Sequence, residues 1–118
     1  MRIRLLDLAH ARSGDKGDRC NVGVIARRPE WYTVLAAYVT ADAVARHFQG
    51  RIRGPVERYE LANLSALNFV LHGALEGGGT LSLRTDAQGK VFSTDLLRLE
   101  LDLPDELAAR LSLPGRPS

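Results

Sequence analysis

Short apolar runs separated by turn residues dominate the first part of the chain and predict two strands. Residues 2–10 consist mostly of Ile, Leu and Ala and indicate a largely buried strand. Residues 12–19 contain two glycines, two aspartates and no apolar residue, so we expect a turn-rich loop there. Residues 20–26, with valines at 22 and 24, then predict a second strand.

A helical region follows, and proline, threonine and glycine residues mark its limits. Pro29 suits the first turn of a helix, because a proline there loses no hydrogen bond. Apolar side chains then recur at helical spacing as far as residue 38. Thr40 can cap a second helical stretch, which the glycines at positions 50 and 54 end.

The centre of the chain predicts a strand followed by a helix. Residues 56–61 predict the strand. The next segment, Ala66 to about Leu75, is apolar around most of a helical circumference, so we expect a buried helix there. Asn63 or Ser65 can cap this helix, and the three glycines at 77–79 end it.

The last third of the chain predicts strands and a short helix. A hairpin over residues 81–92 would turn at 86–89. Leucines at 97, 99, 101 and 103 alternate with charged residues and predict a strand over 96–103. Pro104 then opens a helix to about residue 111, and residues 114–118 form a flexible tail.

Strands and helices mixed in one short chain predict an α+β fold. Their order is strand, strand, helix, strand, helix, then further strands and a terminal helix. We therefore expect a ferredoxin-like sandwich with a mainly antiparallel sheet and helices on one face. In a chain of 118 residues, this fold should occupy residues 1–113 as a single domain.

Composition narrows the function only slightly. Sixteen Lys and Arg against fourteen Asp and Glu give a formal charge of +2 and a pI near 9.0, which does not imply a nucleic-acid partner. The single cysteine cannot form an internal disulfide, and with three histidines it offers no metal-ligand cluster. No apolar run approaches the roughly 20 residues of a membrane span, and the N-terminus lacks a signal-peptide pattern. We therefore expect a cytoplasmic protein.

The glycine- and aspartate-rich loop is the first candidate site. Backbone N–H groups at its glycines could surround an anion, with a lysine as a point charge. The spacing matches neither a phosphate-binding P-loop nor an EF-hand. A hydrated cation held by the carboxylates, or a plain solvated turn, are the other interpretations. The residues concerned are Ser13, Gly14, Asp15, Lys16, Gly17, Asp18 and Asn21.

A polar stripe on the predicted second helix is the second candidate site. Ser65, Asn68 and His72 are three and four residues apart and would share one helix face. Buried polar groups need hydrogen-bond partners, so the stripe either meets them inside the protein or lines a cleft. The glycines that follow, among them Gly77 and Gly78, would let a ligand approach. A histidine with a purely structural role is the other interpretation.

Three blocks of the chain carry a resemblance to a known family. They are HARSGDKGD (10–18) with NVGVIAR (21–27), then VERYEL (56–61), NL (63–64) and ALNFVLHGAL (66–75) with the glycines at 77–79, and finally LR (83–84) with DAQGK (86–90). These blocks resemble the C-terminal ferredoxin-fold domain of the acyclic terpene utilisation proteins, the AtuA family. The resemblance covers about residues 5–101.

The resemblance implies a ferredoxin-like domain associated with bacterial catabolism of acyclic terpenes and related branched acyl compounds, as coenzyme A thioesters. Members of the family usually carry this domain behind a much larger N-terminal domain, which this chain lacks. We therefore expect a separately encoded, large AtuA-like partner chain.

Our leading hypothesis is an accessory or ligand-binding subunit of an AtuA-type complex. It would need no cofactor of its own, and a coenzyme A thioester is its possible ligand. Lys16 and the loop N–H groups would hold an anionic group, while Asn63, Asn68 and His72 would supply polar contacts.

Two other functions stay open. A small stand-alone enzyme would use His72 as general acid or base, with Asp15 or Asp18 as the orienting group. An RNA-binding module is disfavoured, because no pair of aromatic residues on a strand offers a stacking platform. We also expect a homo-oligomer, a dimer, when the chain is purified alone, since sheets of this type expose edges and a free face.

Overall fold

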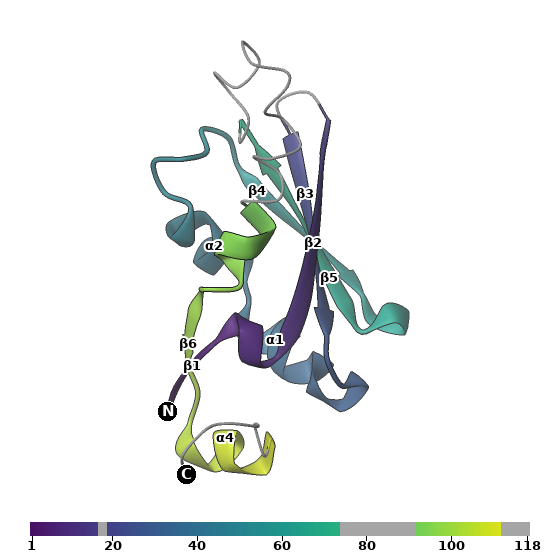
Figure 1. Ribbon diagram of the computed structural model, residues 1–118, viewed down its shortest axis with the longest axis vertical. Helices are drawn as coiled ribbons and strands as arrows, with labels where there is room; N and C mark the ends of the chain where they lie inside the picture. The colour runs from purple at the N-terminus through teal and green to yellow at the C-terminus, as the bar shows by residue number, and fades with distance from the viewer. Residues whose placement is uncertain (17–18, 74–91, 112–118) are drawn as a thin grey trace.

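A four-stranded antiparallel sheet forms the centre of the protein (Figure 1). The computed structural model describes residues 1–16, 19–73 and 92–111, and it describes residues 15 and 16 by their backbone only. The strand order is β2-β3-β5-β4, so β3 and β5 are paired on both sides. The strands span Ala9–Lys16 (β2), Arg19–Ala26 (β3), Val56–Leu61 (β4) and Ala66–His72 (β5).

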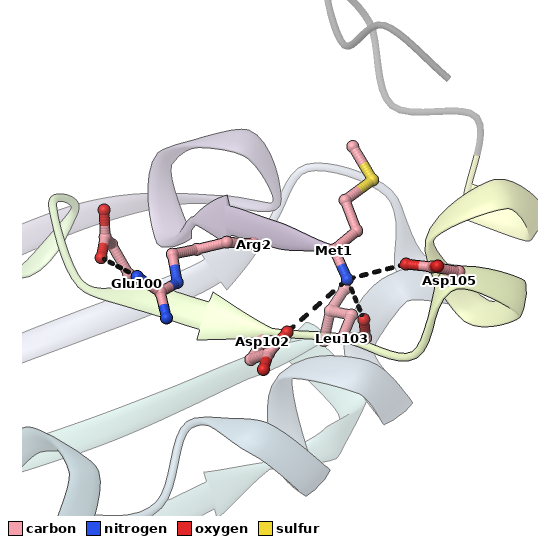
Figure 2. Close-up of polar contacts among 6 residues, drawn as sticks. All are labelled: Met1, Arg2, Glu100, Asp102, Leu103 and Asp105. Atoms are coloured by element: carbon pink, nitrogen blue, oxygen red, sulfur yellow. Dashed lines mark hydrogen bonds and ion pairs between the residues drawn. The ribbon is translucent and has the colours of Figure 1, made fainter.

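A second, two-stranded sheet brings the start of the chain beside its end. Here β1 (Arg2–Arg4) pairs antiparallel with β6 (Glu100–Asp102), and the 3-10 turn η1 (Leu5–Asp7) leads from β1 into β2. Figure 2 shows the Met1 ammonium donating to the carbonyl oxygen of Leu103 at 2.6 Å and to the carboxylate of Asp105 at 2.9 Å. Asp105 begins the helix α4 (Asp105–Leu111), so these contacts fix α4 to the edge of the small sheet.

Two helices lie on one face of the main sheet. Residues Pro29–Trp31 form a 3-10 turn, η2, which leads into α1 (Tyr32–Tyr38), and α2 (Ala41–His47) follows. α1 contacts β3 and β5, and α2 contacts β4. The predicted cap is confirmed, because the Thr40 hydroxyl accepts a hydrogen bond from the Ala43 N–H at 3.0 Å. A further helical turn covers residues 92–96.

The core lies between this sheet face and the helices. Every second residue of the central strands is buried, as expected for strands with one face against the core. These residues are Cys20, Val22, Val24 and Ala26 in β3 and Leu67, Phe69 and Leu71 in β5. Val34 and Leu35 of α1 and Val44 of α2 belong to the same cluster.

The predicted helix at 66–75 is wrong, since residues 66–72 form strand β5. Leu67, Phe69 and Leu71 are buried with a period of two, while the residues between them are half-buried. A continuous apolar run fits a central strand as well as a buried helix, and periodicity alone does not separate them. Residues 66–72 form a strand because they pair with both β3 and β4. Strand β5 ends before Gly73, whose φ is positive (+70°).

Two other boundaries differ from the prediction. Residues 12–16 and residue 19 belong to the hairpin strands β2 and β3 rather than to a loop. In place of one long strand, segment 2–10 contains β1, η1 and the first two residues of β2, and segment 96–103 contains the last residue of the helical turn 92–96 and the short strand β6. The strands at 20–26 and 56–61 and the terminal helix are confirmed. The predicted hairpin over residues 81–92 and the tail lie almost wholly outside the described residues.

Candidate functional site

The face of the main sheet opposite α1 and α2 has a different character from the core face. Among the described residues no helix packs on it, and its side chains are exposed or half-buried except that of Ala66, which is 4% exposed. We call it the open face, and it contains His10, Arg12 and Gly14 of β2, Arg19, Asn21, Gly23 and Ile25 of β3, Glu57, Tyr59 and Leu61 of β4, and Ala66, Asn68, Val70 and His72 of β5.

Strand register places the polar residues of the two predicted sites next to each other on this face. Asn68 is paired with Gly23 on one side and with Tyr59 on the other. His72 is paired with Arg19, and Asn21 is paired with Val70, which lies between Asn68 and His72 along β5. Asn21 is therefore the diagonal neighbour of both Asn68 and His72, at a spacing of about 7–8 Å, while Asn68 and His72 are four residues apart along β5.

His72 belongs to a hydrogen-bonded cluster with two residues of β4. Its Nε2 lies 3.0 Å from Oε1 of Glu57, and the Tyr59 hydroxyl donates to the same oxygen at 3.3 Å. The hydrogen bond from His72 lowers the pKa of Glu57, and this effect is larger than that of partial desolvation, which raises the pKa. The hydrogen bond from Tyr59 and the charge of Arg19 lower the pKa further. The negative charge of Glu57 in turn raises the pKa of Tyr59. The cluster therefore holds an ionised carboxylate that orients the imidazole.

The backbone of His72 is held by the segment that precedes β4. The Gly54 N–H donates to the His72 carbonyl oxygen at 2.8 Å, and the His72 N–H donates to the Pro55 carbonyl oxygen at 3.1 Å. A Cβ at position 54 would lie 2.5 Å from the His72 Cβ. Only glycine allows this close approach, which fixes His72 beside Glu57.

The remaining predicted residues occupy several places. Gly14 is paired with Asn21 on the open face, whereas Ser13 is paired with Val22 of the core face. Lys16 is paired with Arg19 and Asp15 with Cys20, so position 16 shares the register row of His72 and position 15 does not. Gly17, Asp18, Gly77 and Gly78 lie outside the described residues.

Asn63 lies apart from the other candidates. It is in the 3-10 turn η3 (Ala62–Leu64), next to the end of β5 that begins at Ala66. His72 is six strand residues farther on, roughly 20 Å away along β5. Asn63 and His72 therefore do not contact the same small group. Ser65, between them in sequence, has a positive φ of 52° and belongs to the turn.

Four residues of the open face were not among the candidates predicted from the sequence, namely Glu57, Tyr59, Arg12 and Arg19. Within the described residues neither Arg12 nor Arg19 has an ion-pair partner within 4 Å, and both are exposed. The sequence could have indicated that Glu57 and Tyr59 share a face of the sheet, because they alternate with the helix-facing Arg58 in the predicted strand 56–61. Interpreting residues 66–72 as a strand would have placed Asn68 and His72 beside them.

One end of the open face is apolar. Tyr59 and Leu61 are 48% and 38% exposed, and Leu64 in the adjacent η3 is 61% exposed. Ile25 lies in the same region, paired with Ala66, which is itself paired with Leu61. Exposed apolar side chains gathered beside a polar cluster are a feature of interaction surfaces.

A second titratable cluster, away from the open face, has a structural role. Asp95 pairs with Arg51, and His47 Nε2 lies 2.9 Å from the Asp95 carbonyl oxygen. Partial burial alone would raise the pKa of Asp95, but the hydrogen bonds and charges of Arg51 and His47 together outweigh it, and the pKa is lowered. These contacts join the end of α2 to the helical residues 92–96.

Comparison with protein families identifies the chain. The sequence profile of the AtuA ferredoxin-like domain matches residues 3–102 of the 118 residues. The chain belongs to this family. Comparison with curated proteins and with solved structures gave no match.

Membership of the AtuA ferredoxin-like domain family agrees with the architecture. The α+β class, the antiparallel sheet and the ferredoxin-like fold expected from the sequence are confirmed. In the described ranges no helix is long and apolar enough to span a bilayer. Over the same residues, no three His, Cys, Asp or Glu side chains are grouped so that they could hold a metal ion.

Proposed function

We propose that this AtuA-type domain is an accessory subunit that binds a separately encoded, larger AtuA-type chain through its open face. The observation that supports this is a four-stranded sheet with helices on one face and none of the described elements on the other. A sheet face of this kind usually packs against a second layer, either within its own chain or in another.

The chemistry of the open face fits a protein partner. Tyr59, Leu61 and Leu64 provide aromatic and aliphatic anchors of the type that dominate binding energy at interfaces. The adjoining residues Asn68, Glu57 and Arg19 are polar, as at the rim of an interface. A surface with both parts excludes water around the anchors and orients the partner.

The proposed pathway and ligand are those that the resemblance to the family implies. We place the complex in the cytoplasm, in the catabolism of acyclic terpenes or related branched acyl compounds, with a coenzyme A thioester as ligand. Polar groups at the His72 end of the open face would then contribute to a site completed by the larger chain. Alone, the chain would cover the same face by forming a homodimer.

Co-purification with the large AtuA-type chain tests the proposal. We expect a stoichiometric complex by size-exclusion chromatography with light scattering, and loss of that complex in Leu61→Glu. Leu6→Glu is the matched control, because Leu6 is 40% exposed but lies in η1. Absence of any association of the wild-type chain at micromolar concentration would refute the docking function.

An enzyme acting on an acyl-CoA-like substrate is the second candidate, and the Glu57–His72 pair favours it. A carboxylate that orients an imidazole is a common arrangement for general acid–base catalysis. The His72 side chain is 29% exposed and therefore reachable. Here His72→Gln should abolish turnover of an acyl-CoA probe, whereas an inactive wild-type chain with intact partner binding would exclude this candidate.

A further inference from the structure

Two glycines in the middle of paired strands have no structural reason within the described chain. Gly14 and Gly23 lie in the β2–β3 ladder, where eight successive residue pairs leave no room for a bulge. Neither glycine has a φ in the left-handed region. A Cβ would meet nothing within 4 Å at Gly14, and only the Arg12 carbonyl oxygen at 3.9 Å at Gly23. Alanine would therefore fit at both positions.

Glycine in a strand weakens the fold relative to alanine, because it loses more backbone entropy and packs nothing. Where no turn, bulge or close internal contact requires it, a strand glycine marks close approach by another molecule. Here both glycines belong to the open face, at neighbouring register positions. At Gly14 and Gly23 the backbone of the sheet is therefore not covered by a side chain of its own, and we call these two positions the glycine floor.

Around the glycine floor lie polar side chains whose hydrogen-bonding or charged groups have no partner among the described residues. Arg12 is paired with Gly23, Asn21 is paired with Gly14, and Asn68 flanks Gly23 from β5. The half-buried amide of Asn68 has no hydrogen-bond partner among the described residues. Arg12 lacks an ion-pair partner over the same part of the chain. The three side chains together offer one guanidinium and two amides.

The charges around the glycine floor favour the binding of an anionic group from another molecule. Glu57 is the only acidic residue among the open-face residues, and it already accepts hydrogen bonds from His72 and Tyr59. Arg12, which is paired with Gly23, therefore leaves the β2 side of the glycine floor positive, whereas the Arg19 charge acts on Glu57. A carboxylate matches Arg12 through paired N–H donors and can accept further bonds from amide N–H groups.

We propose that the glycine floor receives an acidic side chain of the larger AtuA-type chain, with its carboxylate on Arg12 between Asn21 and Asn68. This rests on the proposed docking function and specifies the chemistry of the contact. The partner's backbone approaches closely because Gly14 and Gly23 carry no side chain, while Tyr59 and Leu61 pack on its apolar residues. Electrostatic complementarity of this kind fixes the orientation of a docked partner.

The first arm of the test needs no partner. Thermal unfolding of Gly23→Ala and Gly14→Ala should show midpoints equal to or higher than that of the wild type, because the added methyl group meets open space at position 14 and only an ordinary van der Waals contact at position 23. Midpoints lowered by several degrees would show that the fold itself requires the glycines, and this would overturn the inference.

The second arm measures binding to the larger chain by calorimetry. Arg12→Glu and Gly23→Val should each weaken binding by about tenfold or more, at unchanged unfolding midpoints. Arg46→Glu, an exposed arginine on α2, is the matched control and should stay within about twofold. Wild-type binding that both open-face variants retain would overturn the glycine floor but leave the docking function intact.

Two further outcomes would also decide against the inference. If the wild-type chain does not bind the larger chain at all, the docking function fails, and the inference fails with it. If Arg12→Glu and Gly23→Val change only the mass of the isolated chain in solution, the occupant of the floor is a second copy rather than an acidic partner.

Discussion

Among single side chains, Glu57 has a charge state that its neighbours directly favour. Hydrogen bonds from His72 and Tyr59 favour its ionised form, so its pKa in the folded protein lies below the ordinary 4.5. A lowered pKa means that the folded state binds fewer protons than the unfolded state in this range. The stabilisation is present above the ordinary pKa and is lost as the pH falls through the folded pKa.

Glu57→Gln should therefore flatten the acid side of the stability profile. Between about pH 5 and pH 3 the wild type should lose more unfolding free energy than the variant, because only the wild type must protonate this carboxylate. Urea denaturation at a series of pH values measures the difference. His72→Gln should reproduce most of the flattening, and parallel profiles for all three proteins would show that the pair does not contribute.

Arg58 is the residue of β4 that connects the sheet to the helices. Its guanidinium donates to the carbonyl oxygens of Ala36 at 2.9 Å and Val39 at 3.1 Å, at the end of α1. It also donates to Glu60 at 2.6 Å. These bonds satisfy helix carbonyls that have no partner within the helix.

Arg58→Met should lower the free energy of unfolding by about 1–3 kcal/mol, since it leaves partly buried carbonyls unpaired. Arg46→Met, on the exposed side of α2, should change it by less than about 0.5 kcal/mol. Chemical denaturation compares the two. Equal effects of both substitutions would contradict the bridging role of Arg58.

At the scale of elements, β5 decides the geometry of the site. As a helix, residues 66–75 would have presented Ser65, Asn68 and His72 as one stripe. As a strand, the segment presents Asn68, Val70 and His72 together and aligns them with β3 and β4. Local sequence does not distinguish the two, because a central strand is apolar on one face and half-buried on the other.

Alanine substitutions along β5 should show a period of two. Phe69→Ala should cost about 3–5 kcal/mol, because Phe69 is fully buried, whereas Val70→Ala on the open face should cost about 1 kcal/mol or less. Phe69→Leu should give a smaller loss of the same sign if the alanine variant does not fold. Similar costs at positions 69 and 70 would contradict the orientation of the strand.

How far the sequence predicts this fold depends on the type of segment. Alternating or capped segments, such as β3, β4 and α2 with its Thr40 cap, could be predicted from local physics. The arm of β2 at residues 12–16 could not, since glycine and aspartate favour turns locally and only pairing with β3 extends it. Asn68 and His72 could be singled out by residue type, but their neighbour Glu57 depends on long-range register.

At the scale of the whole molecule, the open face is a sheet surface without a covering layer among the described residues. The isolated chain should therefore form a dimer, with a mass near twice 12.9 kDa. Light scattering at several concentrations gives this mass, and Leu61→Glu should shift it towards the monomer. A wild-type chain that stays monomeric at high micromolar concentration would contradict self-association through this face.

Hydroxyl-radical footprinting can show whether the larger chain docks on the open face. Oxidation of Tyr59, Leu61 and Leu64 is compared between the complex with the large AtuA-type chain and the dilute chain alone. These side chains are 48%, 38% and 61% exposed, and Leu6, at 40%, is an internal control away from the face. We predict protection of the first three with Leu6 still reactive. A complex in which all three stay as reactive as in the free chain would contradict the account.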